Sequence, residues 1–196
     1  MDDALEHLRR GGVVAAATET LFGLLADATR AEAIDVLLRV KPRGADKGLP
    51  LILPSREIWG ELVVALPEVA RRLGAALWPG PLTIALPAAP GVDPRILLDG
   101  RVAVRLPGPC AAAELAARFA RPLTATSANL AGMPPAATDA EVRRAFPQTP
   151  LGLPLVVPGT APGGEPSTVV VVEGDEVRVV RVGAISEARV HAAARG

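Results

Sequence analysis

The sequence predicts an α/β fold in which a twisted mixed parallel/antiparallel sheet is flanked by helices, and three observations support it. Short apolar runs rich in valine, leucine and isoleucine alternate with amphipathic stretches along the 196 residues. Residues 168–173 and 176–182 flank the turn Gly174-Asp175, which indicates a β-hairpin and therefore an antiparallel pair. Capping signals mark helix starts between the strands. A chain of this length, nearly half apolar, is expected to form one domain over residues 1–196.

The individual elements follow from the same patterns. Strands are expected at 13–17, 49–53, 82–87, 101–106, 122–126, 154–157, 168–173 and 176–182. Helices are expected at about 2–10, 30–40, 67–77, 110–120 and 139–146. Thr29 with Glu32, and Thr138 with Glu141, match the capping box of a helix start, and Pro67 suits a first helical turn.

Composition narrows the function classes. The formal net charge is zero, so the molecule as a whole has no positive electrostatic field that would attract nucleic acid. Any RNA contact would need a local group of arginines. The single cysteine, Cys110, allows no internal disulfide and no thiolate metal cluster, and it is expected to be a small buried thiol. The N-terminus is acidic and no apolar run reaches the ~18 residues of a membrane span, so we expect a cytoplasmic location without membrane contact.

Both lysines of the chain, Lys41 and Lys47, lie in one short run with Arg43, while every basic residue outside that run is an arginine. Pro42 and Gly44 break the preceding helix, so the three cations are expected to be exposed on a loop. They either close over a triphosphate or lie on an ordinary solvated loop. The phosphate-loop and dinucleotide glycine motifs are absent from the sequence, so any nucleotide must be held in another way.

Polar groups also follow other predicted strands, at the ends where open α/β sheets place ligands. Thr18, Glu19 and Thr20 follow the first strand, and the hydroxyls either bind a ligand or cap a helix. Arg101 and Arg105 share one face of their strand. Arg105 either grips a substrate carboxylate or pairs with one of the protein's own carboxylates, because a buried arginine needs an anion.

The strand that ends near Thr126 leads into Ser127 and Asn129. Their oxygens suit phosphate groups or the waters of a magnesium ion, or else they shape a turn. No His/Asp partner supports Ser127 as a nucleophile. We therefore expect Ser127 to be a binding residue at most.

Eight segments, in this order along the chain, carry a resemblance to a known family. They are Gly11-Gly12-Val13-Val14, Thr18-Glu19-Thr20-Leu21-Phe22-Gly23-Leu24, Lys41-Pro42-Arg43, Trp78-Pro79-Gly80-Pro81-Leu82-Thr83, Val102-Ala103-Val104-Arg105, Thr126-Ser127-Ala128-Asn129-Leu130-Ala131-Gly132, and Pro166-Ser167-Thr168-Val169 with Arg181-Val182-Gly183-Ala184-Ile185. Together they resemble the YrdC-like family over almost the whole chain. The chain stops soon after the last segment, which resembles the short, single-domain type.

The resemblance implies a YrdC-like fold with a concave basic cavity and the activity of an L-threonylcarbamoyladenylate synthase, a nucleotidyltransferase. With magnesium, such an enzyme condenses L-threonine, bicarbonate and ATP to threonylcarbamoyl-AMP and pyrophosphate. Threonylcarbamoyl-transferase proteins then modify tRNA next to the anticodon, and tRNA is a further candidate partner. The alternative is a module that binds tRNA or double-stranded RNA without catalysis, although the chain offers few aromatic residues for base stacking.

The resemblance also implies roles for particular residues. Catalysis and ATP binding would fall to Lys41 and Arg43, further ATP contacts to Lys47, Ser127, Asn129 and Arg181, and L-threonine binding to Thr20, Arg105 and Ser167. Two positions differ from the family pattern. Ala17 replaces a usual proline, and residues 51–54 lack the histidine that many members carry on the threonine side.

Overall fold

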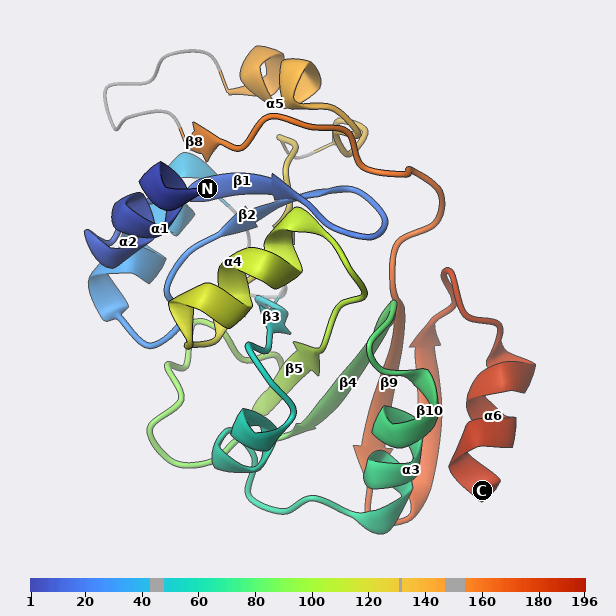
Figure 1. Ribbon diagram of the computed structural model, residues 1–196. Helices are drawn as coiled ribbons and strands as arrows, with labels where there is room; N and C mark the ends of the chain where they lie inside the picture. Colours follow the sequence, from blue (N-terminus) through green and yellow to red (C-terminus); the bar gives the residue numbers. More distant parts are fainter. Residues whose placement is uncertain (43–47, 131, 147–153) are drawn as a thin grey trace.

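The computed structural model describes residues 1–42, 48–130, 132–146 and 154–196, and its strands form two sheets rather than the one expected (Figure 1). One sheet has four strands in the order β7-β2-β1-β8, and the other has six in the order β10-β9-β4-β5-β3-β6. Both sheets contain parallel and antiparallel pairs, so the predicted mixed α/β architecture is confirmed.

The four-stranded sheet is built around β1 (Val14–Ala17), whose residues are almost entirely buried. It pairs antiparallel with β2 (Phe22–Leu25) and parallel with β8 (Leu155–Val156). The strand β2 was not predicted, because it is only four residues long and one of the four is Gly23. Residues 18–21 therefore join two antiparallel strands, so the alternative in which their hydroxyls cap a helix is wrong.

The six-stranded sheet contains the predicted hairpin, β9 (Thr168–Glu173) and β10 (Glu176–Arg181). Next to β9 lies β4 (Leu82–Pro87) in a parallel pair, followed by β5 (Arg101–Arg105) in an antiparallel pair. The sheet ends with β3 (Leu51–Ile52), parallel to β5, and β6 (Leu123–Thr124), antiparallel to β3.

The segment predicted as one strand at 122–126 is divided between the two sheets. Its first part is β6 of the six-stranded sheet, and its end belongs to β7 (Thr126–Ser127), which pairs with β2 of the other sheet. The Thr124 hydroxyl accepts a hydrogen bond from the Ala26 amide at 2.9 Å, and this contact stabilises the segment where the chain passes from one sheet to the other. The two sheets therefore meet where the chain enters the bend at residues 127–129, called here the Ser127 turn.

Helices cover the sheets on several sides (Figure 1). On the side of the four-stranded sheet, α1 (Asp2–Arg9) packs with α4 (Ala111–Phe119) in one apolar cluster, and α2 (Ala31–Val40) and α5 (Asp139–Ala145) pack into the larger one. At the other end of the molecule α3 (Glu68–Leu77) lies against α6 (Glu187–Arg195) beside β10. The helix α6 and the short 3₁₀ helix Glu57–Glu61 were not predicted. Among the described residues, every helix is too short or too polar to span a membrane.

One of the two predicted capping boxes is present. Thr138 accepts from the Glu141 amide at 3.2 Å and the Glu141 carboxylate accepts from the Thr138 amide at 3.1 Å. The box predicted for Thr29 and Glu32 is wrong, because α2 has Arg30 at its N-cap without a side-chain cap. The Asp27 carboxylate accepts both the Thr29 amide, at 2.9 Å, and the Thr29 hydroxyl, at 2.7 Å.

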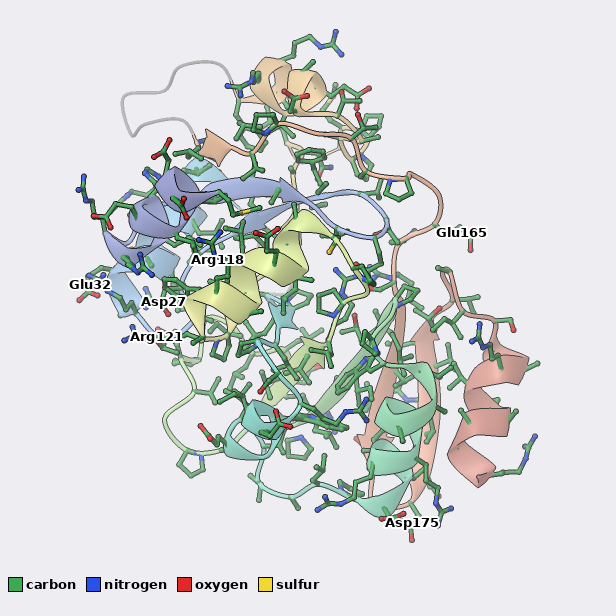
Figure 2. The ribbon with its side chains drawn as sticks, in the orientation of Figure 1. Asp27, Glu32, Arg118, Arg121, Glu165 and Asp175 are labelled. Atoms are coloured by element: carbon green, nitrogen blue, oxygen red, sulfur yellow. The ribbon has the colours of Figure 1, made fainter. Side chains whose placement is uncertain are left out.

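Asp27 is a completely buried carboxylate, and it also accepts from Arg121 Nη1 at 3.2 Å (Figure 2). We expect Asp27→Ala to lower the free energy of unfolding by about 2–4 kcal/mol, because it leaves the donors of Thr29 without an acceptor. In a chain of this size that corresponds to a fall in Tm of roughly 4–16 °C. Glu32→Ala is the control, since the Glu32 side chain is 77% exposed in a loose pair with Arg30. Equal melting temperatures of the two variants would contradict the role of Asp27.

Candidate functional site

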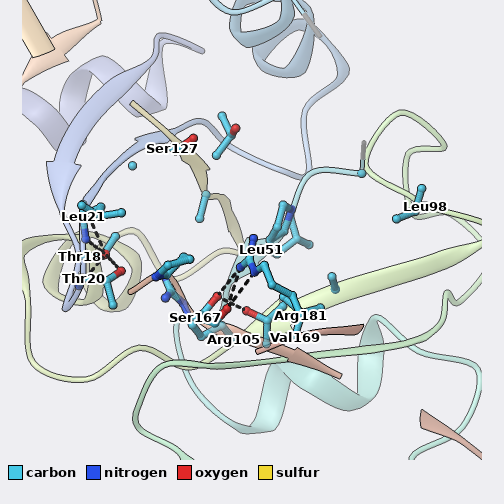
Figure 3. Close-up of a pocket in the computed structure, with 18 of the residues that line it drawn as sticks. Thr18, Thr20, Leu21, Leu51, Leu98, Arg105, Ser127, Ser167, Val169 and Arg181 are labelled. Atoms are coloured by element: carbon cyan, nitrogen blue, oxygen red, sulfur yellow. Dashed lines mark hydrogen bonds between the residues drawn. The ribbon is translucent and has the colours of Figure 1, made fainter. Parts of the chain in front are cut away.

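A cavity of about 450 Å³ lies where the two sheets meet (Figure 3). Its wall combines the β1–β2 turn, the exposed face of β5, the β6–β7 crossing and the segments around Ser167 and Arg181. The predicted site residues that line it are Thr20, Arg105, Ser127, Ser167 and Arg181. Five stretches that are far apart in the sequence thus converge on one cavity. Arg43 and Lys47 lie outside the described residues.

The β1–β2 turn presents two hydroxyl groups to the cavity, those of Thr18 and Thr20 (Figure 3). Thr18 Oγ1 donates to the Leu21 carbonyl at 2.7 Å and accepts from the Thr20 and Leu21 amides at 3.2 Å. The two hydroxyls lie 3.2 Å apart. Because the Thr18 proton is already donated to the Leu21 carbonyl, Thr18 does not donate to Thr20 in that contact. The lone pairs of Thr20 Oγ1 remain as acceptors, which suits a ligand N–H group.

Strand β5 carries the predicted alternation, since Arg101, Ala103 and Arg105 line the cavity while Val102 and Val104 are buried on the other face. Arg105 is 7% exposed, and its Nη1 lies 3.3 Å from Glu19 Oε1. Both interpretations of Arg105 are therefore compatible with its position. It pairs with a carboxylate of the protein and it also lines the cavity.

Ser167 also lines the cavity and contacts two other side chains, those of Arg181 and Thr83. Arg181 donates to the Ser167 carbonyl from Nε at 3.1 Å and from Nη2 at 2.8 Å, and Nη2 also reaches the hydroxyl at 3.2 Å. The same hydroxyl lies 2.9 Å from that of Thr83, a buried residue of β4. Burial of the guanidinium against this segment lowers the pKa of Arg181, and the positive charge of Arg105 nearby lowers it further. Arg181 remains a cation at neutral pH, so two positive groups face the same space.

Gly183 explains why the strand end around Arg181 lies so close to Ser167. A Cβ atom at Gly183 would stand 2.0 Å from the Pro166 carbonyl oxygen, so no other residue permits this approach. The Gly183 amide donates to the buried Thr168 hydroxyl at 2.9 Å. Backbone contact between the two segments thus places the Arg181 side chain over Ser167.

Lys41 docks onto the Ser127 turn from the end of α2. Its ammonium donates to the Ser127 carbonyl, to Ser127 Oγ at 3.1 Å and to Asn129 Oδ1 at 3.0 Å. The predicted encounter of the lysine with the Ser-Ala-Asn segment is confirmed for this residue. Its predicted exposure is wrong, because Lys41 is only 9% exposed and lies behind Ser127 rather than among the residues that line the cavity.

Three residues of this region were not assigned a role from the sequence. Thr83 was quoted only within a motif, although a hydroxyl inside an apolar strand is a usable signal. Arg101 lines the cavity on the face of Arg105, pairs with Glu173, and has a buried Nε without a hydrogen-bond partner in the part of the chain that the structure describes. Glu19 was noted only as part of a polar turn, and nothing in its sequence position reveals that it meets Arg105.

The oxygen donors near Lys41 fit a magnesium ion only through its waters or through phosphates. Ser127 and Asn129 offer a hydroxyl and an amide oxygen, which are neutral hard donors. Within the described ranges there is no group of three histidine, cysteine, aspartate or glutamate side chains close enough to hold a metal. A magnesium ion at this place would therefore be carried mainly by the phosphates of a nucleotide.

Comparison with known proteins places this geometry in context. The family model Sua5_yciO_yrdC, described as "Telomere recombination", matches residues 6–183. A protein of Stenotrophomonas maltophilia named threonylcarbamoyl-AMP synthase is 41% identical over 140 residues, which cover 69% of this chain and 75% of the relative. A protein of the same name from Halorhodospira halophila is 38% identical over 167 residues, covering 84% of this chain and 85% of the relative.

Solved structures show the same architecture. The crystal structure of Pyrococcus abyssi Sua5 complexed with L-threonine superposes with a TM-score of 0.85 at 30% identity and covers 97% of this chain. This chain spans 56% of the length of that Sua5 chain. Escherichia coli YciO has a TM-score of 0.80 over 94% of this chain at 22% identity, which supports the fold alone. The predicted YrdC-like fold is thereby confirmed.

Proposed function

Because the chain belongs to the Sua5/YciO/YrdC family, we propose that it is an L-threonylcarbamoyladenylate synthase. In this proposal it is a nucleotidyltransferase that condenses L-threonine, bicarbonate and ATP to threonylcarbamoyl-AMP and pyrophosphate. The observation that carries the proposal is the convergence of Thr20, Arg105, Ser127, Ser167 and Arg181 on one cavity. The L-threonine complex of the similar Sua5 protein supports threonine as the amino acid.

The amino-acid half of the reaction is assigned to the wall formed by Thr20, Arg105 and Ser167. Arg105 holds the carboxylate of threonine through its guanidinium, and Thr20 Oγ1 accepts from the amino group. The amine attacks the carbon of bicarbonate and loses a proton, water leaves, and a carbamate remains. The cavity positions the amine and keeps the carbamate close to the nucleotide.

The nucleotide half is assigned to the cations and the Ser127 turn. A carbamate oxygen forms a bond to the α-phosphorus of ATP while the bond to the bridging oxygen breaks and pyrophosphate leaves. Lys41, Arg43, Lys47 and Arg181 stabilise the negative charge of the phosphates, with Ser127 and Asn129 as hydrogen-bond partners. The Lys41 ammonium now serves Ser127 and Asn129, so ATP binding exchanges part of these contacts for phosphate contacts. Magnesium, when bound with ATP, neutralises phosphate charge.

The wider setting follows from the same proposal. The chain acts as one domain over residues 1–196, in the cytoplasm. Its product passes to threonylcarbamoyl-transferase proteins that modify tRNA next to the anticodon, and tRNA is a further candidate partner of the chain.

The direct test is pyrophosphate release by the purified chain with ATP, magnesium, bicarbonate and L-threonine. We expect release that stops when threonine or bicarbonate is omitted, because the carbamate that displaces pyrophosphate forms only when both are present. D-Threonine in place of L-threonine is the matched control for binding geometry. Tight binding of RNA with no threonine-dependent pyrophosphate would overturn the proposal in favour of an RNA-binding module.

A further inference from the structure

Glu19 lies behind the cavity wall, not in it. Thr18 and Thr20 on either side of it line the cavity, while Glu19 is absent from the lining and its side chain is 14% exposed. The Glu19 side chain lies beside Gly108, where a Cβ atom added to the glycine would stand 3.9 Å from Glu19 Cβ. Burial raises the pKa of the nearby Cys110 thiol, and the negative charge of Glu19 raises it further. Glu19 is therefore enclosed by protein.

The carboxylate of Glu19 is bound by charge alone. Both of its oxygens are buried and have no hydrogen-bond partner within the described residues, and its ion-pair partner is Arg105 at 3.3 Å. A buried carboxylate without hydrogen bonds is costly, and it is retained only where a cation compensates it. The pair thus depends on Arg105 remaining in place, and the orientation of Arg105 depends on the pair.

The N–H donors of the Arg105 guanidinium are not used in hydrogen bonds to the described residues. Its guanidinium has five N–H donors, and it donates no hydrogen bond to any residue that the structure describes. Contact with Glu19 occupies the side of Nη1, which leaves Nε and Nη2 for a two-pronged bond to an incoming carboxylate. Arg181 repels Arg105 across the same space. The Glu19 carboxylate on the other side of Arg105 offsets this repulsion.

We propose that Glu19 is a positioning residue that holds the Arg105 guanidinium from behind, so that its free edge faces the carboxylate of the amino-acid substrate. The proposal rests on the proposed function and assigns the recognition of the substrate carboxylate to a pair of residues. Glu19 touches no substrate. It acts through the direction and the local charge of Arg105.

The test compares L-threonine with L-threoninamide, which lacks the carboxylate charge, in the pyrophosphate assay. The wild-type protein should prefer threonine strongly in kcat/KM. In Glu19→Gln we expect this preference to fall about tenfold, mainly through a higher KM for threonine, because Arg105 loses its anchor. In Glu19→Asp, which keeps the charge but lengthens the pair, we expect a loss of about threefold. A merely structural role would change the amount of active protein and leave the preference unaltered.

Glu68→Gln is the matched control, because the Glu68 side chain is 62% exposed in a surface pair with Arg72. It should keep the wild-type preference. If the wild-type protein prefers threonine and every folded Glu19 variant keeps that preference, the positioning role is overturned while the proposed function stands. If the wild-type protein shows no threonine-dependent release at all, both are overturned.

Discussion

Arg105→Ala should nearly abolish threonine-dependent pyrophosphate release and also lower the stability of the protein. The truncation removes the proposed partner of the substrate carboxylate, so we expect kcat/KM for threonine to fall at least about a hundredfold. It also leaves the buried Glu19 carboxylate without a compensating charge, which costs about 3–5 kcal/mol. The fall in Tm should be roughly 6–20 °C, measurable by calorimetry. Arg118→Ala is the control, because Arg118 pairs with Asp2 and Glu114 at the surface (Figure 2).

A double variant separates the two effects of Arg105→Ala. Replacing Glu19 by leucine and Arg105 by methionine removes both buried charges and keeps similar volumes. We expect most of the stability to return, because apolar pairs replace buried ion pairs at little cost. Threonine-dependent turnover should remain lost. A double variant that melts normally and still uses threonine would show that Arg105 serves the fold and not the substrate.

Lys41→Met should reduce ATP-dependent turnover at least about a hundredfold, because one of the cations that stabilise the transferring phosphates is lost. The structure changes what is expected for stability. Replacing an exposed lysine would leave the stability of the fold unaffected. Lys41, however, is only 9% exposed and contacts Ser127 and Asn129. Loss of these contacts should cost about 1–3 kcal/mol. Both quantities are measured on the same preparation, with the kinetics taken well below the melting temperature.

Arg39→Met is the matched control for Lys41→Met, since it removes a cation two residues earlier from the exposed side of α2. Its kinetics and Tm should stay near the wild-type values. Lys41→Arg should restore little activity, because the planar guanidinium does not replace a compact ammonium among three acceptors. A folded Lys41→Met protein with unchanged kcat and KM for ATP would contradict the assignment of Lys41 to the phosphates.

Most of the strands and the main helices followed from the order of residues. Apolar runs identified β1, β4, β5 and the β9–β10 hairpin, because alternation and turn chemistry are local properties of the chain. The face of β5 that carries Arg101 and Arg105 was also predicted correctly, since successive side chains of a strand point to opposite sides. The motifs that resemble the YrdC-like family are readable in the sequence alone.

The errors arose where distant partners compete with local signals. Thr29 matches a helix cap in sequence, but the Asp27 carboxylate accepts both its amide and its hydroxyl. Residues 122–126 resemble one strand, yet they are shared between two sheets, because burial reveals that a residue faces a core and not which strand it pairs with. The helix α6 lacked a capping box, although Ser186 does cap it.

By itself, the sequence determined which side chains are chemically suited to hold anions, because residue type and strand alternation are readable along the chain. Only the tertiary structure decided how they are paired. Lys41 meets Ser127 across 86 residues, and Glu19 meets Arg105 from a different sheet. Such pairs form because sheet crossing and backbone packing bring the charges together, and a buried charge is stable only beside its partner.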